Sequence, residues 1–150
     1  MRITKVKYDG AKVRIEYEQA REVGDPDEFS LNCADRPVPE FEAALAALID
    51  DVLEICELPP EYAKGIKVRG VSISWTNDVM GACVTALRTL QTANSPLVIN
   101  TPHLPSDQYS EGGEAPLMSE EFVDHVETLM DRATDYINGT RAQQSLPLAS

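Results

Sequence analysis

The sequence predicts an α+β fold in which antiparallel strands, in one sheet or two, pack beside two helices in the order β-β-β-α-β-β-β-α. Segments with the apolar–polar alternation of half-buried strands are interspersed with two segments whose apolar residues recur at helical spacing. Net charge follows the same division: residues 1–21 and 62–106 each carry +3, whereas 22–61 and 107–135 carry −11 and −8. We therefore expect a mildly basic sheet backed by strongly acidic helices.

Three strands and a helix are predicted in the first half of the chain. Residues 2–8 and 12–19 flank Asp9-Gly10, a dipeptide favoured in two-residue type I′ hairpins. A third strand is predicted from Phe29 to Ala34. The helix begins at Pro37 or Pro39 and ends before Pro59-Pro60, with one apolar stripe formed by Phe41, Leu45, Leu48, Val52 and Ile55.

The second half repeats this plan. Strands are predicted over Ile66–Trp75, Val79–Leu90 and Ser95–Ile99, although the apolar spacing of residues 79–90 also fits a helix. The last helix begins after Ser119, a good N-cap, and ends at Asn138-Gly139. We expect residues 1–139 to form a single domain and residues 140–150 to be a flexible C-terminal tail.

Composition excludes several classes of protein. An apolar fraction of 43% indicates a packed core, and no apolar run approaches the roughly 20 residues that span a bilayer. The N-terminus lacks the features of a signal peptide, and three separated cysteines do not suggest a disulfide scaffold. We expect a soluble cytoplasmic protein, and its net charge of −12 argues against binding to a long nucleic-acid duplex.

Two groups of residues are candidates for ligand binding. If residues 67–75 are regularly extended, Lys67, Arg69 and Trp75 share one face and would contact a phosphate and a base; the alternative is a solvated edge strand. Asn100, Thr101 and His103 follow an apolar strand and would supply hydrogen bonds; the alternative is a turn stiffened by Pro102 and Pro105.

No catalytic, metal-binding or cofactor-binding motif is present. The isolated serines and cysteines have no nucleophile motif around them, and no glycine pattern matches a phosphate-binding loop. His103 and His125 are 22 positions apart, and His125 is expected on the solvated face of its helix. The sequence therefore predicts a protein that is not an enzyme and needs no cofactor.

Five short segments, spread in order over most of the chain, resemble a family of small accessory proteins encoded by tailed phages and prophages. The segments are Glu28-Phe29-Ser30-Leu31-Asn32-Cys33, Ile55-Cys56-Glu57-Leu58-Pro59, Val68-Arg69-Gly70-Val71-Ser72, Asn100-Thr101-Pro102-His103 and Tyr136-Ile137-Asn138-Gly139. The resemblance implies expression in the cytoplasm of an infected bacterium and carries over no catalytic residue.

These features together lead to two functional hypotheses. The first is a non-enzymatic phage-type protein that counters a host defence by sequestering a small anionic, nucleotide-derived ligand. The second is an acidic interaction module that mimics DNA and inhibits a nucleic-acid-binding protein through its basic surface. A homo-oligomer is also plausible, in which basic strands of one copy face acidic helices of another.

Overall fold

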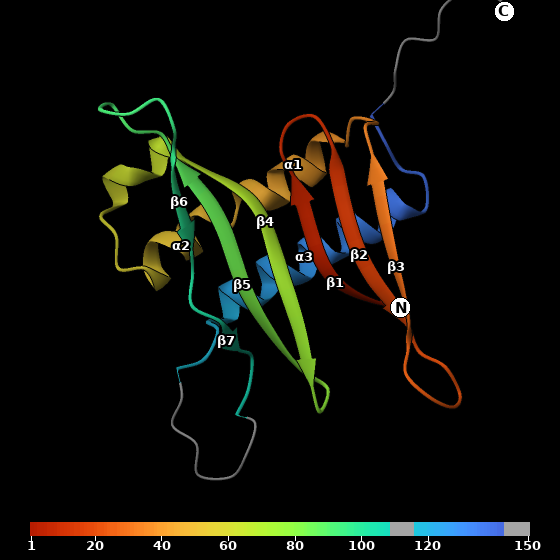
Figure 1. Cartoon of the computed structure of the whole chain (residues 1–150). Helices are drawn as coiled ribbons and strands as arrows, with labels where there is room; N and C mark the ends of the chain where they lie inside the picture. The colour runs from red at the N-terminus through yellow and green to blue at the C-terminus, as the bar shows by residue number, and fades with distance from the viewer. Residues whose placement is uncertain (109–115, 143–150) are drawn as a thin grey trace, which may run out of the picture.

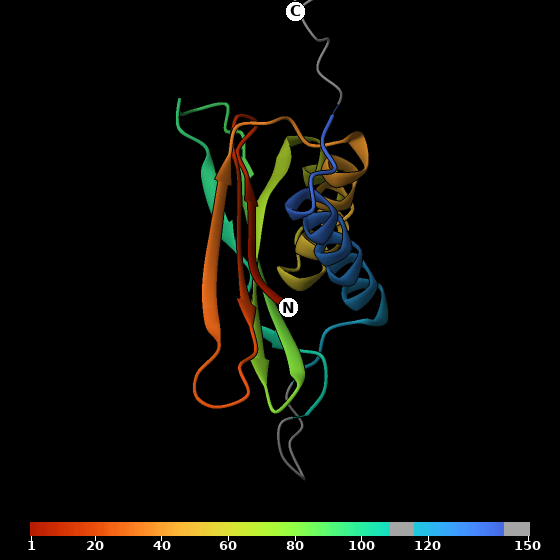
Figure 2. The ribbon, with the colours of Figure 1, turned by 90° about the vertical axis from the view of Figure 1, so that its right-hand side faces the viewer.

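Seven antiparallel strands form one sheet, and helices cover one of its faces (Figures 1 and 2). This computed structural model describes residues 1–108 and 116–142. It confirms the predicted α+β class. The elements in chain order are β1 (Arg2–Tyr8), β2 (Val13–Gln19), β3 (Asp27–Cys33), α1 (Pro39–Ala46), α2 (Ile49–Ile55), the 3-10 helix η1 (Pro60–Gly65), β4 (Ile66–Thr76), β5 (Val79–Arg88), β6 (Leu97–Asn100), β7 (Leu104–Pro105) and α3 (Glu120–Ile137).

The sheet consists of two meanders joined at its centre. The strand order is β3-β2-β1-β4-β5-β6, and β7 pairs with the end of β5. β1 and β4 provide the only pairing between the first three strands and the later ones within the described part of the chain. Figure 1 is viewed from the uncovered face, with β3 at one edge of the sheet and β6 near the other. The question of one sheet or two is therefore decided in favour of one.

The β4–β5 hairpin and the β1–β2 hairpin have different turns. Val79–Arg88 is a strand, and Asn77 and Asp78 both have positive φ (51° and 63°), as a two-residue type I′ turn requires. The turn after β1 is longer than predicted, because Tyr8 pairs with Val13 and leaves four residues between the strands. There the Asp9 carboxylate accepts the N–H groups of Ala11 and Lys12, which stabilises the wider loop.

The single helix expected between residues 37 and 58 is instead two helices, α1 and α2. The chain tightens at Ala47 and Leu48, where the Leu48 N–H donates to the carbonyl of Leu45 three residues earlier. This change of direction lets both helices pack on the sheet, and Leu48 between them is fully buried. The end of α2 before Pro59 is as predicted.

The capping predictions for α3 are confirmed. The Ser119 hydroxyl accepts the N–H of Phe122, and Asn138 is the C-cap, followed by Gly139 with φ of 104°. The start of the predicted flexible tail is held in place, because the Arg141 guanidinium contacts the Asp35 carboxylate at 2.8 Å and the Ala142 N–H donates to the Arg36 carbonyl. Residues 143–150 of that tail, and 109–115 of the predicted loop over 105–118, lie outside the described residues.

The core lies between the sheet and the helices. Its fully buried side chains include Ile15, Val71 and Val84 from the strands and Phe41 and Leu129 from the helices. Burial of this apolar surface holds the two layers together. Across residues 1–108 and 116–142, no helix is long and apolar enough to cross a membrane.

We predict that Leu48→Ala destabilises the protein by about 2–5 kcal/mol, because it leaves a cavity at the junction of α1 and α2. Chemical denaturation followed by circular dichroism measures the change. Leu97→Ala is the matched control, since Leu97 on β6 is 47% exposed and should change stability by no more than about 0.5 kcal/mol. Equal losses in the two variants would contradict this view of the core.

Candidate functional site

The uncovered face of the sheet, here called the open face, carries most of the basic strand residues. On β1 and β2, Val6 and Ile15 point into the core, whereas their neighbours Lys5, Lys7 and Arg14 occupy the alternate positions on the open face. Lys67 and Arg69 on β4 lie on the same face, since Ile66 and Val68 are buried. The expected mildly basic sheet is thus a sheet whose basic side chains gather on one exposed face.

Trp75 does not share this face with Lys67 and Arg69, so that expectation is wrong. The pairing of β4 shifts register between Val68 and Gly70, which is a β-bulge. A shift of one residue moves every following side chain to the other face, and Val71 is accordingly buried. Trp75 packs against the core, and its indole Nε1 donates to the Ile3 carbonyl at 3.2 Å.

The basic residues of the open face surround a shallow pocket of about 360 Å³, here called the basic pocket. Three strands of the sheet and the β1–β2 loop contribute four cations to it, together with Asp9 as its single carboxylate. The lining residues are Lys7, Tyr8, Asp9, Lys12, Arg14, Asn32, Arg69, Gly70 and Thr85. Arg69 also lines an adjoining hollow of about 200 Å³ together with Lys67.

Arg69 is the half-buried cation of this pocket, and part of its guanidinium is left unsatisfied. Its Nη1 is buried and has no hydrogen-bond partner in the described structure. Lys7 and Lys12 likewise form no ion pair within residues 1–108 and 116–142, whereas Arg14 contacts Glu16 at 3.0 Å. Because a buried N–H without a partner is costly, Arg69 is an incompletely satisfied cation at the basic pocket.

Two local features hold the basic pocket in shape. Gly70 lies where β1 approaches β4 closely, since a Cβ atom there would be 2.5 Å from the Val6 carbonyl oxygen. Asp9 stays ionised beside the cations: backbone N–H groups of Lys12 and Ala11 lower its pKa, and the charge of Arg69 lowers it further.

The side chains of Asn100, the last residue of β6, and Thr101, which follows it, point to opposite faces of the sheet. Asn100 lies on the open face, where its side-chain oxygen accepts from the Thr85 hydroxyl at 2.8 Å, and Thr85 lines the basic pocket. Thr101 is 3% exposed, and its hydroxyl accepts the N–H of Val84. Asn100 thus remains available to a ligand, whereas the Thr101 side chain serves the structure.

His103 lies farther along the open face, against β4 and β5. Its Nε2 is 2.7 Å from the Ser74 hydroxyl oxygen, and its ring lies so close to Gly81 that a Cβ atom there would be 2.3 Å from Nε2. The segment is fixed on both sides, by Thr101 bonded to Val84 and by β7 paired with β5. His103 is therefore a positioned imidazole, about four strand residues, or roughly 13 Å, from the basic pocket.

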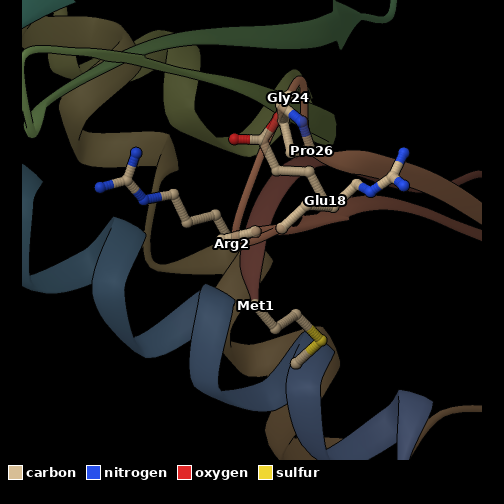
Figure 3. A pocket seen from close by; sticks show the side chains of 7 residues that line it. Met1, Arg2, Glu18, Gly24 and Pro26 are labelled. Atoms are coloured by element: carbon tan, nitrogen blue, oxygen red, sulfur yellow. The ribbon is translucent and has the colours of Figure 1, made fainter.

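A larger hollow of about 480 Å³ lies at the opposite end of β1 and β2, as Figure 3 shows. Its two arginines already have partners: Arg2 contacts the Asp78 carboxylate and lies over the Trp75 ring, and Arg21 is 3.8 Å from Asp27. Glu18 also lines this hollow. Because both arginines are paired and Glu18 adds a negative charge, this hollow is a poorer anion site than the smaller basic pocket.

Buried Asp51 and partly exposed His125 form a pair that the sequence did not predict. His125 Nδ1 donates to Asp51 Oδ2 at 2.7 Å, which links α3 to α2, and Asp51 is only 3% exposed. Burial raises the pKa of Asp51, and the hydrogen bond from His125 opposes that rise. The adjoining hollow of about 440 Å³ is also lined by Glu54 and Glu57, so it does not suit an anion.

Sequence reasoning missed Lys7, Lys12 and Arg14 as members of the candidate site. Their alternation with buried residues was visible in the sequence and placed Arg14 on the face opposite Val13 and Ile15. The missing information was that β1 pairs with β4, which brings Lys7 opposite Gly70 and next to Arg69. Nothing local in either segment predicts that pairing.

We predict that Asp51→Asn changes how stability depends on pH. Burial raises the pKa of Asp51 in the folded state. The contribution of Asp51 to the free energy of unfolding is therefore complete at low pH and is lost as pH rises through the folded pKa. The unfolding free energy of the unmodified protein should therefore rise relative to that of Asp51→Asn as pH falls from 7 to 4. Denaturation series at several pH values test this, and a constant difference would contradict it.

No known protein family, curated protein or solved structure matches this chain. The resemblance to phage accessory proteins therefore remains a prediction. What the chain does has to be inferred from the geometry and charge of its own surfaces.

Proposed function

We propose that this protein binds a small, multiply charged anion in the basic pocket and acts without catalysing a reaction. The observation that carries the proposal is the buried, unpartnered Nη1 of Arg69 at the edge of a pocket that also holds Lys7 and Lys12. An anion there would accept from Arg69 and neutralise two lysines that have no ion pair in the described structure.

The rest of the molecule favours a small ligand over a long polyanion. The helices carry carboxylates on their exposed faces, and Arg132 is the only lysine or arginine in α1, α2 and α3. A nucleic acid that extended beyond the open face would meet this negative field. A compact phosphate or polyphosphate that stays within the basic pocket avoids it.

The position of Trp75 limits how a ligand in the basic pocket can be recognised. With its indole packed against the core, Trp75 cannot stack on a base bound at the basic pocket. Recognition of a nucleotide-derived ligand would then rest on its phosphates at Arg69 and on hydrogen bonds farther along the open face, to Asn100 and His103. Sequestration of such a signal in an infected bacterium is the role that the phage resemblance supports.

We predict that Arg69→Ala weakens anion binding roughly ten- to a hundredfold, the effect of losing one charge-assisted hydrogen bond of about 1.5–3 kcal/mol. Isothermal titration calorimetry with pyrophosphate and with ATP at low ionic strength measures it. Native mass spectrometry after exposure to a bacterial nucleotide extract would identify the natural ligand by its mass.

Arg21→Ala is the control, because it removes the same charge at the far end of β2, and it should bind normally. Circular dichroism must show that both variants fold. Absence of binding to either probe, together with a clean mass spectrum after the extract, would overturn the proposal. If both variants lost affinity equally, the loss would reflect the change in net charge and not a contact of Arg69 with the anion, which would contradict the proposed site.

The acidic helix faces support the second candidate function, inhibition of a nucleic-acid-binding protein by DNA mimicry. Asp50 and Glu54 are exposed on α2, whereas Asp51 is buried against His125 and belongs to the core. Replacing the exposed carboxylates of α2 by lysine tests this function, and the variant must leave Asp51 unchanged. We predict that this inhibition is lost in an Asp50→Lys, Glu54→Lys variant and is weakened by salt.

Competition measures this second function directly. The protein is added to a basic DNA-binding protein that carries a fluorescent duplex, and release of the duplex is followed by anisotropy. Release by the unmodified chain but not by the reversed variant supports mimicry. No release at low salt rejects it, and leaves the basic pocket as the functional surface.

A further inference from the structure

We infer that two copies of this chain pair through their β3 strands to form a continuous antiparallel sheet across a two-fold axis. β3 is the terminal strand of the sheet, with β2 on one side and no strand on the other within the described residues. In Figure 1 it runs along the edge of the molecule, and in Figure 2 it lies in front of the other strands. The inference is independent of anion binding.

The edge of β3 has few of the features that usually prevent strand pairing: it follows Pro26 and carries Asp27 and Glu28 at one end, but it is long and regular. Its sequence, DEFSLNC, contains no lysine, arginine or proline, and its seven pairs with β2 run without a bulge. Such a strand presents a row of backbone N–H and C=O groups that a further strand can pair with. The opposite edge is different, since β6 has only four residues.

An apolar side chain on β3 also lacks cover. Phe29 is 46% exposed although it lies on the helix side of the sheet, where it stacks on Tyr17 with ring centroids 5.3 Å apart. Leu31 follows on the same side, opposite Ile15 of β2. A partner strand that places apolar residues beside Phe29 would remove it from water.

Symmetry then selects one register. Antiparallel pairing centred on Ser30 uses all seven residues, and it places Phe29 of each copy opposite Leu31 of the other on the helix side. Centring on Phe29 or Leu31 would leave residues at one end of each strand unpaired. Both sets of helices then lie on one side of the extended sheet, and both basic pockets lie on the other.

The charges on the open face fit this register. Within one copy, Glu28 lies directly opposite Glu18, an unfavourable pairing of like charges. In the dimer Glu28 would lie opposite the second copy's Asn32, which itself lies opposite Arg14 of its own β2. Arg14 and Glu28 of different copies would be two strand spacings apart, roughly 10 Å between backbones, a gap that their long side chains can close.

The test is the oligomeric state of the ligand-free protein, followed by a register-specific cross-link. Light scattering after gel filtration over micromolar to 0.1 millimolar protein should give twice the chain mass of 16.5 kDa. Ser30→Cys should form a reducible disulfide-linked dimer under mild oxidation, because the two residues 30 face each other across the axis. The unmodified chain, with its three cysteines, and Ser95→Cys in an exposed loop are the controls and should not cross-link.

The Phe29→Lys variant gives a second, independent test of the dimer. Since Phe29 is half exposed, the variant should keep its circular dichroism spectrum but become monomeric, whereas Val98→Lys on β6 should stay dimeric. A monomer at every concentration overturns the inference. A dimer that survives Phe29→Lys, or one in which Ser30→Cys does not cross-link, shows a different interface and overturns it as well.

Discussion

The pairing of β1 with β4 is the constraint on which the rest of the structure depends. It joins two three-stranded meanders that are otherwise separated by two helices along the chain. It also brings Gly70 against the backbone of Val6, at the point where β4 contains its bulge. The residues before the bulge present cations to solvent, and those after it present Val71, Ile73 and Trp75 to the core.

This arrangement separates charge into two layers. The alternating charge along the sequence becomes a basic open face on one side of the sheet and acidic helices on the other. Glu16 pairs with Lys5 and Arg14 on the open face, whereas Lys7 and Lys12 form no ion pair within the described residues. The proposed anion would be held by Arg69, Lys7 and Lys12, the cations of the basic pocket that form no ion pair in the described part of the chain.

His103 and His125 have different roles in the fold. His125 is held by buried Asp51 and links α2 to α3, which makes it part of the framework. His103 is held against Ser74 and Gly81 on the open face, where one side of the imidazole remains exposed. The first pair ties stability to pH, and the second fixes a hydrogen-bonding ring on the open face.

The sequence by itself determined most of the strands, the caps of α3 and the division of charge, because these depend on residues close together along the chain. It left residues 79–90 open between strand and helix and did not predict β7. The strand predicted from Phe29 is present as β3, and Ser119 caps its helix as expected. Only the tertiary structure decided which side chains form the site. A one-residue bulge in β4 turned Trp75 away from Arg69, and a pairing between distant strands brought Lys7 to it, because register and long-range contacts depend on the packing of the whole sheet.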